Sequence, residues 1–199
     1  MIDLGPATNE QMVLAFVRAE IDSSRFGRCY RDFLEATRMS RGLIDNADLG
    51  SSAENAARVA LLRACRGYPD RNLFQGFPAD VDWRLLEFDA EDLSHLKYAN
   101  YSDWIALSGG TRRVIDGAAN VQQSSDKRRV EPILGMAARL KAGDKFPELI
   151  AVREGEQDFV LLEGHARATA YAIVRPEHNL QAIVGSSPTI ATWAFYPKA

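Results

Sequence analysis

The sequence predicts a mixed α/β (α+β) fold, in which a small mixed sheet carries a packed N-terminal helical region. The first third of the chain contains stretches of helical periodicity, and the last third has the order strand, turn, strand, helix. The chain has 199 residues, of which 46% are hydrophobic, so it can bury a sizeable core. We therefore expect a helical region over residues 1–80 and an α/β domain over residues 81–199, joined in one compact unit.

The helices predicted in the first third have recognisable ends. Thr8 and Gln11 fit a capping box ahead of the first helical pattern. Ser51 or Ser52 begins the third pattern, and Gly67 ends it. The predicted helices cover residues 8–21, 29–39 and 52–67.

The remaining elements follow from alternation, apolar runs and turn residues. Two adjacent glycines in "SGGTRR" require a turn at residues 108–113, after an aromatic-rich helix. Further along the chain, Gly143 is the expected end of the helix predicted at residues 131–144. An acidic run at residues 89–98 suits a helix N-terminus. The predicted strands are residues 81–88, 148–154, 158–164, 180–185 and 189–196, and the predicted helices are residues 98–107, 131–144 and 165–174.

Composition restricts the partners and the compartment. No run of about 18 apolar residues is present, and the first residues lack the order of a signal peptide, so we expect no membrane partner and a cytoplasmic protein. The formal charge of −3 does not favour nucleic acid, although a nucleic-acid partner remains possible. Cys29 and Cys65 lack a CxxC spacing, which predicts two reduced thiols and no metal site. Trp83, Trp104 and Trp193 have apolar neighbours and are expected in the core.

The candidate site is the junction between the strand ending at Glu163 and the helix that follows it. Gly164 allows a sharp turn, after which the N–H groups of His165 and Ala166 point toward an anion. The planar fork of Arg167 could close on a phosphate or a carboxylate. Glu163 could act as a general base or metal contact, and His165 could donate to phosphate or transfer a proton. Glu163 and His165 are therefore the candidate catalytic residues, and residues 164–167 the candidate phosphate site.

A purely structural interpretation of this junction is also open. Glu163 could cap the helix or pair with Arg167, four residues further on. His165 would then be a surface histidine and Gly164 only a turn residue. The sequence does not decide between the two interpretations.

The turn at residues 108–113 is a second candidate for anion binding. Gly110, Thr111 and Arg112 offer backbone N–H groups, a hydroxyl and a guanidinium that could wrap a phosphate. The segment lacks the lysine and the spacing of a P-loop. Its arginines could equally be solvated or pair with neighbouring side chains.

The order strand, turn, strand and then G-x-x-R opening an alanine-rich helix resembles the ParB and sulfiredoxin superfamily, over about residues 130–175. In ParB-like proteins this turn binds nucleotide phosphates. In the related free serine kinases it reads acid, Gly, two residues and Arg, which Glu163, Gly164 and Arg167 match. The resemblance implies a nucleoside triphosphate with Mg²⁺ as cofactor and phosphoryl transfer to a small hydroxyl-bearing molecule.

The chain also departs from the family patterns. His165 stands where a sulfiredoxin has its catalytic cysteine and a partition ParB has a glutamate, and Ala166 stands where the serine kinases have histidine. Two functions therefore remain. One is a phosphotransferase or NTPase, and the other is a nucleotide-responsive regulatory or partition-like module with a DNA or protein partner.

Overall fold

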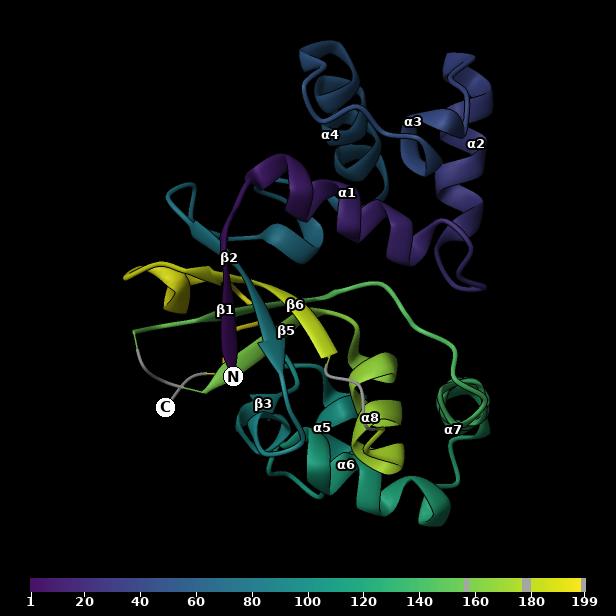
Figure 1. Cartoon of the computed structure of the whole chain (residues 1–199), viewed down its shortest axis with the longest axis vertical. Helices are drawn as coiled ribbons and strands as arrows, with labels where there is room; N and C mark the ends of the chain where they lie inside the picture. Colours follow the sequence, from purple (N-terminus) through teal and green to yellow (C-terminus); the bar gives the residue numbers. More distant parts are fainter. Residues whose placement is uncertain (156–157, 177–179, 198–199) are drawn as a thin grey trace.

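The computed structural model describes residues 1–155, 158–176 and 180–197. It contains one six-stranded mixed sheet with helices packed around it, at 48% helix and 17% strand (Figure 1). The predicted mixed α/β class is confirmed. No helix among the described residues is long and apolar enough to cross a membrane.

The sheet has the order β1-β2-β6-β4-β5-β3. The pairs β4/β6 and β3/β5 are parallel, and the other neighbouring pairs are antiparallel. The strand bounds are Ile2–Ala7 for β1, Asp82–Phe88 for β2, Leu96–Lys97 for β3, Leu149–Arg153 for β4, Phe159–Glu163 for β5 and Leu180–Ser186 for β6.

Helices cover both faces of the sheet (Figure 1). Alternate residues of β4 enter separate cores: Ile150 packs with α1–α4, and Ala151 packs with α5–α8. The helix bounds are Asn9–Glu20 for α1, Gly27–Thr37 for α2, Gly42–Asp45 for α3, Ser52–Arg66 for α4, Ser102–Leu107 for α5, Val114–Asn120 for α6, Lys127–Lys141 for α7 and His165–Val174 for α8. Short 3₁₀ turns occupy Asn72–Phe74, Asp92–His95, Val121–Gln123 and Ile190–Thr192.

Most of the predicted helix ends are confirmed. Thr8 and Gln11 form the capping box of α1, and the Ser51 side chain caps α4 by accepting the N–H of Glu54 at 3.3 Å. Gly67 ends α4 with a φ of 80°, a left-handed conformation that glycine adopts without strain. All three tryptophans are buried, as expected.

Several elements differ from the prediction. Residues 2–7 form the edge strand β1 within the region predicted to be helical. The acidic run begins only a 3₁₀ turn before β3. Residues 189–196, predicted as a strand, form a 3₁₀ turn and irregular chain instead, because the Trp193 Nε1–H donates to the Leu73 carbonyl at 2.6 Å and anchors this segment away from the sheet.

The two cysteines correct a further prediction. Cys29 of α2 and Cys65 of α4 form a disulfide, with their Cα atoms 5.8 Å apart, so the expectation of two reduced thiols was wrong. The pairing could not be found from local spacing, because it is the packing of α2 against α4 that brings the two residues together. The bond ties two of the N-terminal helices to each other.

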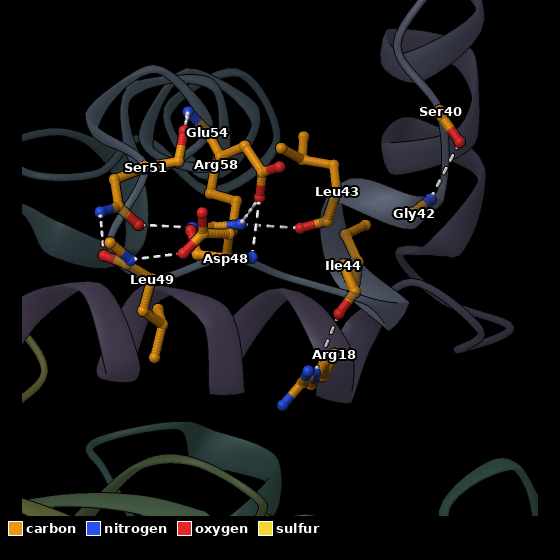
Figure 2. Close-up of polar contacts among 12 residues, drawn as sticks. Arg18, Ser40, Gly42, Leu43, Ile44, Asp48, Leu49, Ser51, Glu54 and Arg58 are labelled. Carbon is orange, nitrogen blue, oxygen red and sulfur yellow. Dashed lines mark hydrogen bonds and ion pairs between the residues drawn. The ribbon is translucent and has the colours of Figure 1, made fainter.

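A buried arginine organises the chain between α3 and α4 (Figure 2). Arg58 is fully buried, and its guanidinium donates to the carbonyl oxygens of Leu43 and Asp48, each at 2.9 Å. It also donates to the Glu54 carboxylate at 2.9 Å. These acceptors occupy most of its donors, so Arg58 has a structural role.

Candidate functional site

The junction between β5 and α8 is a left-handed glycine that leads directly into a helix. Gly164 adopts a φ of 102°, and a Cβ atom placed on it would lie 2.3 Å from Leu149 Cδ2. The positive φ favours glycine at this position, because other residues adopt it only with strain. The first helical bond of α8 runs from Ala168 N–H to the Gly164 carbonyl at 2.8 Å, so the N–H groups of residues 165–167 precede any intrahelical acceptor.

Arg167 is engaged inside the protein. Its side chain is buried, and Nη1 donates to the carbonyl oxygens of Pro147 at 2.7 Å and Glu148 at 3.0 Å. Nη2 donates to the Glu163 carboxylate. The Glu163–Arg167 pair of the structural interpretation is therefore formed. Through these bonds Arg167 connects the chain before β4 with the end of β5 and the start of α8.

His165 lies in an aromatic surround. Its ring centroid is 5.3 Å from that of Trp104, 5.5 Å from that of Tyr101 and 5.9 Å from that of Tyr98. Its Nε2 is shut off from solvent and has no hydrogen-bond partner among the described residues. Burial lowers the pKa of His165 to about 3, so the ring is neutral at physiological pH. This is not the environment of a surface histidine.

Arg129 of α7 packs against Trp104, one of the aromatic residues around His165. The Arg129 guanidinium lies 4.5 Å from the Trp104 ring and pairs with Asp103 and with Asp126, the latter at 3.3 Å. Its acceptors are carboxylates of the protein itself. Arg129 therefore contributes positive potential beside His165 while remaining internally paired.

Two largely buried charged residues of the N-terminal helices, Glu20 and Arg66, were not predicted from the sequence. Glu20, the last residue of α1, is buried and accepts a hydrogen bond from the Tyr30 hydroxyl at 2.7 Å. Arg66, the last residue of α4, lies with its Nε 3.4 Å from Glu20 Oε2. Burial raises the pKa of Glu20 to about 7, and the negative charge of Glu163 adds to that rise. Glu20 follows Phe16 by one helical turn, so the spacing in the sequence could have predicted that Glu20 lies on the buried face of α1.

The second candidate, the turn at residues 108–113, is held by its own neighbours. The Thr111 hydroxyl donates to Asp116 at 2.6 Å, and Arg112 Nη2 donates to Asn100 Oδ1 at 3.1 Å. Gly110 has a φ of 94°, as the predicted turn requires. No hydrogen bond or ion pair within the described part of the chain joins this turn to residues 163–167. Tyr98 is the link, since its N–H donates to the Arg112 carbonyl at 2.7 Å and its ring stacks on His165.

The described residues contain no group of three or more His, Cys, Asp or Glu side chains that could hold a metal ion. Glu163, the carboxylate expected to contact Mg²⁺, is paired with Arg167. The side chains do not fit a protein-held Mg²⁺ site. Any such ion would have to be carried by the phosphates of the ligand and by water, as Mg²⁺ commonly is.

Two surface hollows lie away from the junction. One of about 500 Å³ runs along α4, and a smaller one lies beside the end of α8. The residues lining the first are Ala56, Val59, Ala60, Arg63, Ala64, Gly67, Arg71 and Asn72. None of these is a candidate site residue.

In comparisons with known proteins, the chain matches no family model, no curated protein and no solved structure. The resemblance to the ParB and sulfiredoxin superfamily therefore stays a prediction from the motif. Function has to be argued from the geometry of the junction.

Proposed function

We propose that the protein binds a phosphorylated ligand, with a nucleoside triphosphate as the leading candidate, at the start of α8. The observation that carries the proposal is the left-handed Gly164 followed directly by the first turn of α8, whose N–H groups have no hydrogen-bond partner among the described residues. A helix N-terminus with nearby cations favours an anion through both its donors and its dipole.

The residues of the motif take different roles in this proposal. Backbone N–H groups of His165 and Ala166 contact a phosphate oxygen, and the neutral His165 ring lines the site. Arg167 is a positioning residue, because the carbonyl oxygens of Pro147 and Glu148 already accept from it. It holds the two segments that form the junction rather than closing on the ligand.

Phosphoryl transfer gives Glu163 a catalytic role. The oxygen of a hydroxyl-bearing acceptor would attack the terminal phosphorus, Glu163 would accept the hydroxyl proton, and the bond to the leaving nucleoside diphosphate would break. Pairing with Arg167 keeps the Glu163 carboxylate close to the start of α8. The same pairing also favours the second candidate, a nucleotide-responsive module without turnover, because it gives the carboxylate a structural task.

A charge placed on the first turn of α8 tests ligand binding. Ala166→Asp puts a carboxylate where the phosphate is proposed to bind, while an acidic residue in a first turn favours the helix itself. We expect its melting temperature to equal or exceed that of the parent and its stabilisation by ATP, CTP or pyrophosphate to disappear. Ala166→Asn is the matched control and should retain the ligand response. A ligand response in Ala166→Asp equal to that of the parent would contradict the proposal.

A second measurement separates the enzyme from the binding module. The nucleotide that raises the melting temperature of the parent most is incubated with Mg²⁺, with and without DNA or small hydroxyl-bearing acceptors, and nucleoside diphosphate is quantified. An enzyme consumes the nucleotide, and Glu163→Gln lowers that turnover with little change in affinity. Binding without consumption identifies the module.

A further inference from the structure

The disulfide between α2 and α4 presents its two cysteines unequally to solvent. Cys29 is exposed, whereas Cys65 is partly buried and packs against the core of the N-terminal helices. A disulfide opens when a thiolate attacks one of its two sulfur atoms, and access to solvent helps to decide which atom is attacked. A thiol arriving from solvent therefore reaches Cys29 more readily, and Cys65 is the sulfur that leaves.

The chain around Cys29 carries a positive balance of charge. Residues 25–32 contain three arginines and one aspartate. The aspartate, Asp32, forms an ion pair with Arg28, the residue before Cys29, at 3.4 Å. Arginine side chains near a cysteine favour its thiolate over its thiol, and they attract anionic reagents.

Two of the nearby cations have a fixed position at the start of α2. The guanidinium groups of Arg25 and Arg66 lie 4.9 Å and 3.9 Å from the centre of the Phe26 ring, which caps α2 three residues before Cys29. Arg66 also pairs with Glu20, and Arg25 is exposed to solvent. Cys29 itself lies in the first turn of α2, where the helix dipole adds to the positive potential.

Hydrogen bonds without sulfur also hold α2 in place. The Tyr30 hydroxyl donates to the buried Glu20 carboxylate at 2.7 Å, and Arg31 Nη1 donates to the Ile21 carbonyl at 3.0 Å. Both bonds join α2 to the end of α1. Opening the disulfide leaves them intact, so the two cysteines stay near each other and the disulfide can form again.

We infer that the Cys29–Cys65 disulfide is a reversible modification site, at which an anionic low-molecular-weight thiol of the glutathione type forms a mixed disulfide with Cys29. The small thiolate attacks Cys29 Sγ and forms a new sulfur–sulfur bond. The bond to Cys65 breaks, and its electron pair stays on Cys65 Sγ, which takes a proton from water. The inference does not depend on the proposed function.

A second small thiol completes the reduction. Its thiolate attacks the sulfur of the bound thiol, and Cys29 leaves as a thiolate. Two small thiols are then oxidised to their own disulfide, and the protein disulfide is reduced to two thiols. In the reverse direction, the Cys65 thiolate attacks Cys29 Sγ of the mixed disulfide, releases the small thiol and restores the original bond.

Peptide mapping of the whole protein tests which sulfur is attacked. The parent is treated briefly with reduced glutathione, acid stops the exchange, and the thiols are alkylated at mildly acidic pH before mass spectrometry. Molecules with glutathione on Cys29 and the alkyl group on Cys65 should outnumber the reverse arrangement by about tenfold. Equal amounts of the two arrangements, or an excess of glutathione on Cys65, would overturn the inference.

Single-cysteine variants measure the two thiols separately. Cys65→Ser keeps Cys29 and Cys29→Ser keeps Cys65, and each is treated with oxidised glutathione. Cys65→Ser should take up one glutathionyl group about tenfold faster than Cys29→Ser. Equal rates, or no reaction of Cys65→Ser, would contradict the assignment of Cys29. The mapping of the parent does not require either variant to fold.

Charge variants test the preference for an anionic thiol. Arg25→Gln and Arg28→Gln should each slow the reaction of the disulfide with glutathione by about threefold, because each removes a cation near Cys29. The rate with uncharged 2-mercaptoethanol should stay within about twofold. Arg128→Gln is the matched control, since it removes the same charge from an exposed position of α7. An equal slowing in Arg128→Gln, or an equal slowing with both thiols, would refute the anionic preference.

Discussion

Removal of the Cys29–Cys65 disulfide is expected to lower the free energy of unfolding by about 4 kcal/mol. The bond joins residues separated by 36 positions. Chain entropy for a closed loop of that length gives about 13 cal/mol/K, or about 4 kcal/mol at 25 °C, because the cross-link restricts the unfolded chain. For a protein of this size, each kcal/mol corresponds to about 2–4 °C, so the melting temperature should fall by about 8–16 °C.

The assay compares four samples by urea and thermal unfolding. They are the parent and Cys29→Ser/Cys65→Ser, each with and without reductant. Reductant should shift the parent to the midpoint of the double variant and leave the double variant unchanged. Equal midpoints in all four samples would refute the reasoning, as would rapid alkylation of both thiols in the native, unreduced parent.

Three further changes probe the buried charges. Arg58→Met leaves carbonyl oxygens and the Glu54 carboxylate without their donor, so urea unfolding should show a loss of about 3 kcal/mol; a loss under 0.5 kcal/mol would contradict its structural role. Arg167→Ala should also destabilise by about 3 kcal/mol, since it leaves Glu163 unpaired, and an undiminished melting temperature would remove its positioning role. The folded pKa of Glu20, about 7, exceeds its ordinary 4.5, so the parent loses stability as pH rises between these values. The free energy of unfolding of Glu20→Gln, measured in urea, should therefore rise relative to that of the parent from pH 5 to pH 8. A difference between the two proteins that stays constant with pH would show that Glu20 titrates normally.

The parts of the fold predicted from sequence are those encoded by local chemistry. The capping box at Thr8, the glycine that ends α4 and the order β4, β5, α8 around Gly164 are all present; the predicted turn between the two strands includes residues 156–157, which lie outside the described residues. Each depends on residues close together in the chain, so spacing and turn preference suffice to find them.

The features that were missed depend on distant contacts. Strand β1 exists because residues 2–7 pair with β2, some 80 positions away, and its "LGP" carries no strand signal. The largely buried charges of α1 and α4, Glu20 and Arg66, become neighbours only when these helices pack against each other. The motif identified the junction, but spacing alone could not tell whether Arg167 faces a ligand or the protein's own carbonyl oxygens.

Amide chemical shifts during a pyrophosphate titration test the central claim most directly. The account predicts that the backbone N–H resonances of His165 and Ala166 shift saturably as pyrophosphate is added. Resonances of the turn around Thr111 should move little. Saturable shifts elsewhere with unchanged resonances at the start of α8, or no shift at millimolar pyrophosphate, would contradict the account.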